Sequence, residues 1–176
     1  MKYMNISCRK MGVLKCNCYL LEKNCEYLII DPGDDILEVL EFIGDKNVIG
    51  ILITHGHFDH NGCVSSLVKK TNTMVYDASN LKEGVNNIGS FSFEVIYTFG
   101  HTMDSICFYF RDDKVMFTGD FLFNNTIGRC DLKESNYDYM LKSIDKIKSY
   151  DDDIVIYPGH GISTILGIEK KNNPYF

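Results

Sequence analysis

The sequence has no long apolar run: no stretch approaches the roughly 20 residues that a helix needs to cross a bilayer. Its first eight residues, Met1 to Cys8, lack the continuous apolar segment of a secretion signal. Hydrophobic residues make up 45% of the chain and charged residues 24%, which is typical of a globular protein. We therefore expect a cytoplasmic protein that does not associate with membranes.

The seven cysteines lack the number and spacing of a disulfide framework. Their number is odd, their spacings are irregular, and no secretion signal accompanies them, so we expect reduced thiols. Cys16 and Cys18 are separated by one residue rather than the two of redox and zinc-knuckle pairs, and we interpret them as part of a half-buried strand. Cys63 and Cys130 flank candidate ligand loops, and we interpret them as packing residues.

Positive charge is also scarce, because 18 Lys and Arg face 24 Asp and Glu, giving a net charge of −6. Proteins hold nucleic acid mainly by Lys and Arg on the phosphates, so the composition disfavours a nucleic-acid substrate. The chain also has no linker and no low-complexity segment, and its 176 residues are the length of one ordinary domain, residues 1–176.

All five histidines lie in short clusters that contain glycine. His55, His57 and His60 share the run Thr54 to Gly62 with Asp59, while His101 follows Gly100 and His160 follows Gly159. A single acid, Asp120, follows Thr118-Gly119. Imidazole nitrogens and carboxylate oxygens suit zinc or iron, so this pattern indicates a metal centre.

Seven donors are too many for one zinc, which takes four or five ligands, so the economical assignment is two ions. Alternate side chains of an extended stretch point the same way, so His55 and His57 can bind one ion and Asp59 lies on the same side. The chain then changes direction at His60. We assign His55, His57 and His101 to the first ion. Asp59, His60 and His160 go to the second, and Asp120 bridges the two.

Apolar and β-branched runs predict strands at 18–21, 27–31, 48–53, 93–99, 105–110, 115–117 and 154–157, with a hairpin turning at Asp112-Asp113. Helical spacing follows a cap at Asp34, and recurs at 64–68, 137–147 and 163–171. Each ligand group comes directly after a strand. We therefore expect the ligands to gather along one edge of the structure.

The run from His55 to His60 resembles the H-x-H-x-D-H signature of the metallo-β-lactamase superfamily, and His101, Asp120 and His160 match its later ligand positions. The run Asp120 to Leu132, with its Leu-Phe pair and Ile-Gly-Arg turn, is similar to the glyoxalase II-like branch. This resemblance implies an α+β fold, a four-layer αββα sandwich. The chain stops shortly after His160, so it resembles the short form without the C-terminal helical domain.

The resemblance implies hydrolysis of a small-molecule thioester similar to a hydroxyacylglutathione. Two divalent ions, zinc first with iron or manganese as alternatives, would generate a metal-bound hydroxide near neutral pH. Asp59 would both bind the second ion and steer the proton of the nucleophile, and Arg129 stands where the branch has a basic residue that contacts substrate. A structural salt bridge is the alternative for Arg129.

Other functions stay open at this point. One alternative is a mononuclear iron persulfide dioxygenase, an enzyme that resembles this chain in fold. Its ligand set overlaps with His55, His57, His101 and Asp120. A β-lactamase is less favoured, since many of those enzymes have Cys where Asp120 stands and are exported. A non-catalytic metal-binding relative is least favoured, because all seven ligands are present. The acyl group, the thiol, the metal and the oligomeric state are not determined by the sequence.

Overall fold

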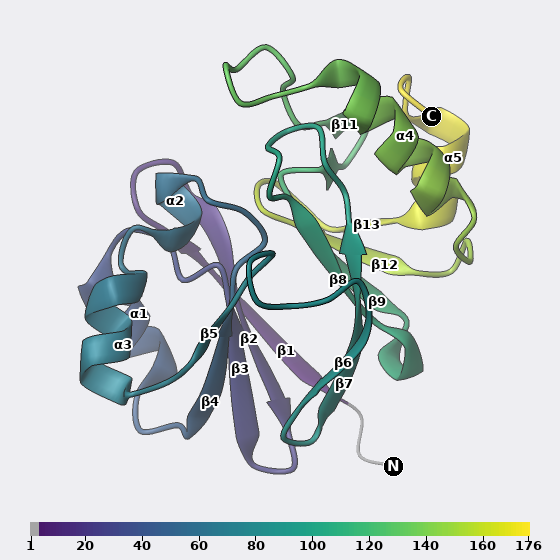
Figure 1. Ribbon diagram of the computed structural model, residues 1–176. Helices are drawn as coiled ribbons and strands as arrows, with labels where there is room; N and C mark the ends of the chain where they lie inside the picture. Colours follow the sequence, from purple (N-terminus) through teal and green to yellow (C-terminus); the bar gives the residue numbers. More distant parts are fainter. Residues whose placement is uncertain (1–3) are drawn as a thin grey trace.

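A computed structural model describes residues 4–176 as two β-sheets packed face to face, with helices on both outer faces (Figure 1). The first sheet has the order β1 (Asn5–Met11), β2 (Cys16–Lys23), β3 (Glu26–Ile30), β4 (Val48–Leu52), β5 (Val75–Tyr76). The second has the order β13 (Thr164–Ile165), β12 (Val155–Pro158), β9 (Val115–Gly119), β8 (Ile106–Phe110), β7 (Phe91–Tyr97), β6 (Gly84–Ile88).

Three apolar layers hold the sandwich together. Between the sheets, Leu28 and Ile30 of β3 share one buried cluster with Phe108 and Phe117 of the second sheet. Ile29 points to the opposite face of β3, where the first sheet packs against α1 (Ile36–Ile43) and α3 (Val64–Thr71). Because successive strand residues face opposite sides and both sides are covered, the central strands are apolar throughout, as predicted.

The fourth layer covers the second sheet. Met140, Ile144 and Ile147 of α4 (Tyr137–Lys148) pack onto that sheet together with Leu166 of α5 (Leu166–Asn172). The arrangement of helices, two sheets and helices confirms the expected αββα sandwich (Figure 1). Along residues 4–176 no helix has both the length and the apolar character required to span a bilayer.

Several predicted boundaries need correction. The N-cap of α1 is Asp35, not Asp34: its carboxylate accepts hydrogen bonds from the backbone N–H groups of Leu37 and Glu38. The last helix begins at Leu166 rather than 163, because Thr164 and Ile165 pair with β12 as β13. The β8–β9 hairpin is present, but the left-handed residue in its turn is Lys114 at φ 52°, after the short 3-10 turn Arg111–Asp113.

Strands without a strong apolar pattern were missed in the sequence. These are the edge strands β1, β5, β6 and β13 and the small ribbon β10 (Leu122–Phe123) with β11 (Thr126–Ile127). Two-residue strands are too short to show an alternation of apolar and polar residues, and β1 is exposed along most of its length. The pairing of these strands with their neighbours therefore makes them strands, rather than a local pattern.

Candidate metal centre

The run from His55 to His60 follows directly after β4, a strand of the first sheet. β4 stops at Leu52, His55 and His57 follow in extended backbone, and α2 (Phe58–Asn61) begins immediately after His57. The extended stretch therefore ends at His57, two residues earlier than the sequence pattern indicated, and Asp59 is carried on the helix with His60. This short turn of helix separates the cluster into two pairs, with His55 and His57 on one side and Asp59 and His60 on the other.

His55, His57 and His101 converge on one point. The Nε2 atom of His55 lies 3.1 Å from Nδ1 of His57, and the Nε2 atom of His101 lies 3.0 Å from the same Nδ1. Nitrogens that bind one tetrahedral zinc at about 2.0–2.1 Å are about 3.3 Å apart. The three imidazoles are therefore spaced as a group that could hold one ion, and they form one of the candidate metal-binding groups in the structure.

Asp59, His60 and His160 converge beside this trio. Oδ2 of Asp59 lies 3.1 Å from Nε2 of His160 and 3.8 Å from Nε2 of His60. His160 comes from the loop after β12, more than a hundred residues later in the chain. The second group thus joins a helix next to the first sheet to a loop of the second sheet.

Asp120, at the end of β9, lies between the two groups. Its Oδ2 atom is 3.7 Å from Nε2 of His101 on one side and 3.7 Å from Nε2 of His160 on the other, while Oδ1 is 3.3 Å from Nε2 of His60. Within residues 4–176, His60 Nε2 and Asp120 Oδ1 are buried polar atoms without a hydrogen-bond partner. Buried polar atoms are costly when unpaired, so a cation between them fits this donor set.

Asp31, which the sequence analysis missed, orients His60. Its Oδ2 atom accepts a hydrogen bond from Nδ1 of His60 at 2.8 Å, and the carboxylate also accepts from the backbone N–H of Thr54 at 2.8 Å and its hydroxyl at 2.7 Å. The Asp31 side chain is buried. A buried acid at the end of β3, the strand next to β4, is the signal in the sequence that could have found it.

The outer nitrogens of two other histidines also have acceptors. Nδ1 of His101 donates to the backbone carbonyl of Arg129 at 2.9 Å, which leaves Nε2 facing the centre. Nε2 of His57 lies 3.1 Å from Oε1 of Glu134, so His57 faces the centre with Nδ1 instead. Glu134 is 33 positions beyond His101 in sequence, and only the loop before α4 brings it here.

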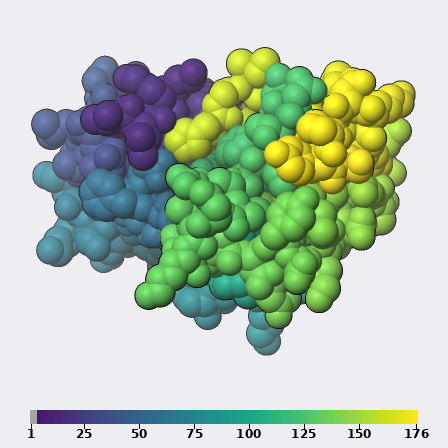
Figure 2. Space-filling view, turned by 90° about the horizontal axis from the view of Figure 1, so that it is seen from above, coloured from purple at the N-terminus to yellow at the C-terminus, as the bar shows by residue number. Residues whose placement is uncertain are grey.

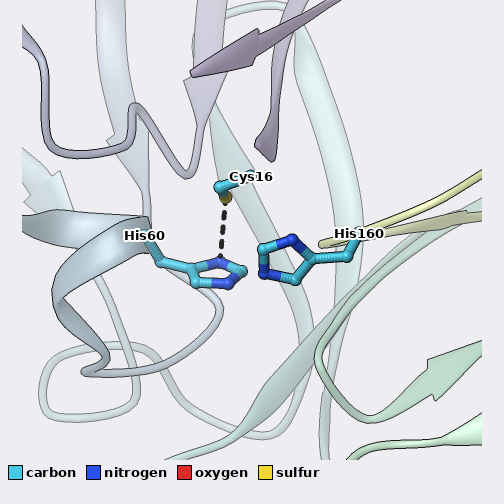
Figure 3. A group of neighbouring side chains, drawn as sticks. All are labelled: Cys16, His60 and His160. Carbon is cyan, nitrogen blue, oxygen red and sulfur yellow. Dashed lines mark hydrogen bonds between the residues drawn. The ribbon is translucent and has the colours of Figure 1, made fainter. Parts of the chain in front are cut away.

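Cys16, at the start of β2, lies behind His60. Its Sγ atom is 3.5 Å from Nδ1 of His60, and the two residues form a potential donor group with His160 (Figure 3). Burial raises the pKa of the Cys16 thiol to about 12, so the thiol is neutral at physiological pH. Cys16 and Cys18 are fully buried rather than half-buried. Cys63 packs in the layer under α1 and α3, and Cys130 borders the layer under α4.

The pKa values of the buried histidines in the cluster shift in opposite directions. Burial lowers the pKa values of His55 and His101, which favours the neutral imidazoles that metals bind. Burial alone would also lower the pKa of His60, but the Asp31 carboxylate and the nearby Asp120 raise it well above its usual value. Burial opposes ionisation of Asp120, yet the closeness of His60, His55 and His160 lowers its pKa.

Arg129 contributes to the site through its backbone. Its carbonyl holds His101, whereas its guanidinium forms two hydrogen bonds to Asp131, from Nε to Oδ1 at 2.7 Å and from Nη2 to Oδ2 at 2.8 Å. Both side chains of this pair are exposed. The salt bridge considered as the alternative role of Arg129 therefore exists, and contact of Arg129 with a substrate stays a prediction.

The structure thus brings together all seven predicted donors, from both sheets, around one edge of the sandwich. The sequence model of the metallo-beta-lactamase superfamily matches residues 11–81 and 75–160, which include every one of them. The chain belongs to the metallo-beta-lactamase superfamily. The expected resemblance is confirmed, and the geometry above is that of a member of this superfamily.

Three proteins illustrate which members of the superfamily the chain is similar to. Hydroxyacylglutathione hydrolase GloC of Haemophilus influenzae is 33% identical over 98% of both chains. The crystal structure of BLEG-1 B3 metallo-beta-lactamase superposes with a TM-score of 0.90 at 29% identity, covering 97% of this chain and 99% of that one. TTHA1623, crystallised in a di-iron-bound form, gives a TM-score of 0.87 at 29% identity, covering 95% and 98%.

Proposed function

We propose that the protein hydrolyses thioesters of the hydroxyacylglutathione type with the help of two divalent metal ions. His55, His57 and His101 would hold the first ion and Asp59, His60 and His160 the second, with Asp120 shared. The observation that carries the proposal is the position of Asp120, whose oxygens face both histidine groups while Oδ1 and His60 Nε2 are otherwise unpaired. Zinc is our first choice of metal, and the di-iron form of TTHA1623 supports iron as the alternative, ahead of manganese.

Divalent ions bound at such a site acidify water and polarise a carbonyl oxygen. The chain itself orients the reacting groups. Asp31 fixes the ring of His60 through Nδ1, and the Arg129 carbonyl fixes His101 in the same way, so their Nε2 atoms stay directed at the centre. The Asp59 carboxylate lies at the edge of the second group, 16% exposed, where it can accept the proton of the attacking water.

A thioester is the substrate class that suits this set of residues. A thiolate leaving group has a pKa of about 8.5, so it departs without a dedicated acid. Hydrolysis then requires only a site for the carbonyl and a base, and Asp59 is the base that we propose. The relation to GloC, 33% identical over nearly the full length of both chains, supports a hydroxyacylglutathione-like thioester. We propose a small-molecule substrate in the cytoplasm and neither nucleic acid nor membrane as a partner.

Elemental analysis of the purified protein, combined with assays of three reactions, tests the proposal. We expect about two zinc or iron ions per chain and hydrolysis of S-lactoylglutathione, detected by free thiol. One iron per chain with oxygen uptake on glutathione persulfide would establish the persulfide dioxygenase alternative instead. Faster cleavage of a chromogenic β-lactam than of any thioester would favour β-lactamase activity, which the name of BLEG-1 states for that protein.

The Asp120→Ala variant links the activity to the shared ligand. Removing this carboxylate takes away the only oxygen ligand common to both groups, so we expect loss of turnover and of at least one ion per chain, with the far-ultraviolet circular dichroism unchanged. Asp153→Asn, an exposed carboxylate paired with Lys114, serves as the control. Near-normal thioester cleavage by Asp120→Ala would contradict the two-ion assignment.

A further inference from the structure

Four large apolar side chains are exposed close to the metal centre. Val13 is 88% exposed, Leu14 65%, Phe58 68% and Ile162 66%. Single exposed apolar residues are common on protein surfaces, but several together next to a polar centre mark a site of binding. We refer to Val13, Leu14, Phe58 and Ile162 as the apolar rim.

Two members of the apolar rim are tied to the ligands by the chain itself. Phe58 is the residue between His57 and Asp59 at the start of α2, and Ile162 is two residues after His160. Neither side chain belongs to the buried layers of the sandwich. Their backbones therefore cannot move away from the centre without moving its ligands.

The other two members form the tip of the β1–β2 hairpin, which contacts both of these segments. Asn17, just after the tip, donates from its backbone to the Gly159 carbonyl at 2.7 Å and from its side chain to the Gly161 carbonyl at 3.1 Å. On the opposite side, a Cβ atom at Gly12 would touch Asp34, which also lies against Gly62 next to the Phe58 ring. Figure 2 shows the purple hairpin directly beside the lime-coloured loop near residue 160.

The segments that carry the seven donors have no positive charge of their own. No Lys or Arg occurs within three residues of any donor in the sequence, and Lys15 is the positively charged residue of the hairpin turn that carries Val13 and Leu14. Phe123, a partly buried residue of β10, adds an aromatic ring whose centroid is 6.4 Å from that of His160. Exposed apolar side chains thus lie on three segments that adjoin the second group of donors, namely the hairpin, α2 and the loop after β12.

We infer that the apolar rim binds the acyl chain of the thioester substrate, so that among the thioesters that the site hydrolyses it favours long acyl chains over short ones such as acetyl and lactoyl. The inference rests on the proposed thioester hydrolysis. Each methylene group that the rim removes from water favours binding, by up to about fourfold when burial is complete. The rim is open to solvent and buries each methylene only in part, so we expect about twofold per methylene.

The test uses thioesters that share one thiol, N-acetylcysteamine, and carry acetyl, lactoyl, butyryl, hexanoyl or octanoyl groups. For the metal-loaded wild type, kcat/KM is expected to rise steadily from acetyl to octanoyl and to be lowest for acetyl and lactoyl. The double variant Val13→Ser/Leu14→Ser and the single variant Ile162→Ser should flatten this rise. Leu37→Ser, which alters a 74% exposed leucine on α1, is the matched control and should leave it unchanged.

Binding is measured separately with the octanoyl amide, in which nitrogen replaces the thioester sulfur. Calorimetry should show tighter binding to the wild type and to Leu37→Ser than to the rim variants, by about tenfold or more for the double variant. If thioesters are cleaved at rates independent of chain length, or if Leu37→Ser flattens the rise equally, the inference fails and the proposed function stands. If the amide binds through the rim but no thioester is cleaved, the proposed function fails.

A second copy of the chain could cover the apolar rim instead. Sedimentation velocity across a range of concentrations distinguishes this case. A wild-type dimer that becomes monomeric in Val13→Ser/Leu14→Ser, with kcat/KM independent of acyl length, would overturn the inference. An unchanged sedimentation coefficient in all variants, together with the acyl-length dependence, supports it.

Discussion

For single residues, the candidate centre depends on which ring nitrogen of each histidine is held in place by other parts of the protein. His60, His101 and His57 each have one ring nitrogen bound by a protein acceptor, from Asp31, the Arg129 carbonyl and Glu134 respectively. These contacts decide which nitrogen is directed inward, Nε2 for the first two and Nδ1 for His57. Acceptors of this kind tune affinity as well as orientation.

The Asp31→Asn substitution tests this directly. An amide in place of the carboxylate removes the negative charge opposite His60 Nδ1. With a single oxygen it also cannot accept both from the Thr54 backbone N–H, which bonds Oδ1, and from His60 and the Thr54 hydroxyl, which bond Oδ2. We expect the affinity for the second metal ion to fall by about 10- to 100-fold. Competition with a chromophoric chelator measures it, and an affinity equal to that of the control Asp131→Asn would exclude the role of Asp31.

The pH dependence of metal binding follows from His60. In the metal-free protein its pKa is raised well above the usual 6.5, so its ring carries a proton that an ion at Nε2 must displace. Metal affinity should therefore fall as the pH is lowered, and binding should release protons near neutral pH. Calorimetry in two buffers of different ionisation enthalpy counts the protons, and no release near neutral pH would contradict this protonation state.

The same raised pKa has the opposite effect on the metal-free fold. Because the protonated ring is stabilised by folding, this contribution is fully present below the unfolded value of about 6.5 and is lost as the pH rises through the higher folded value. Thermal melts of metal-free protein should accordingly lose stability from His60 on the alkaline side. Asp31→Asn should reduce this loss.

Arg129 gives a further prediction for single residues. If its guanidinium exchanges Asp131 for a substrate carboxylate, Arg129→Ala should raise KM for glutathione thioesters by up to about fivefold with little change in kcat. Asp131→Asn, which removes the competing carboxylate, should lower the same KM. Steady-state kinetics with N-acetylcysteamine thioesters, which have no carboxylate, provide the control. An unchanged KM in both variants would leave Arg129 with its backbone role alone.

Among the elements, the ends of helices and strands position the residues of the site. The start of α1 shows that one residue can separate the capping position from its neighbour. Asp34 and Asp35 are adjacent acids before the same apolar stripe, so the sequence does not separate them. In the structure Asp35 caps the helix, with hydrogen bonds of 2.9 and 3.2 Å from Leu37 and Glu38. Asp34 instead lies against Gly12 and Gly62.

Alanine substitutions distinguish the two acids. Asp35→Ala should lower the free energy of unfolding by about 1 kcal/mol, since it leaves two N–H groups of the first turn without their acceptor. This corresponds to a drop in melting temperature of about 2–4 °C for a chain of this size. Asp34→Ala should have a smaller effect in the same denaturant titration. Equal effects would show that the capping bonds do not determine stability here.

At the scale of the whole molecule, the centre joins the two sheets. His55, His57, Asp59 and His60 follow β4 of the first sheet, whereas His101, Asp120 and His160 follow strands of the second. Gly159 allows the close approach: a Cβ atom there would collide with Asp120 Oδ1 and lie 2.6 Å from Cε1 of His60. The two sheets can therefore meet at the centre only if this position lacks a side chain.

Gly159→Ala should push the loop that carries His160 away from the first sheet. We expect loss of one bound ion and at least a tenfold fall in activity, with the sandwich still folded. Gly161→Ala is the control: its Cβ would have no neighbour within 4 Å, and its φ of +81° costs only local strain of about 1–2 kcal/mol. Full metal content in Gly159→Ala, measured by elemental analysis, would contradict the close approach.

The seven candidate donors and the main strands that present them could be predicted from the sequence alone. Histidines and acids of a metal site must be of particular types, and buried strands such as β4 and β9 are continuous apolar runs, so both are visible locally. The contacts of Asp31, Cys16 and Glu134 with the histidines became visible in the folded chain alone, since each of these residues lies on a different element from its partner. Local patterns record which face a residue occupies, but not which distant residue the packing of two sheets brings against it.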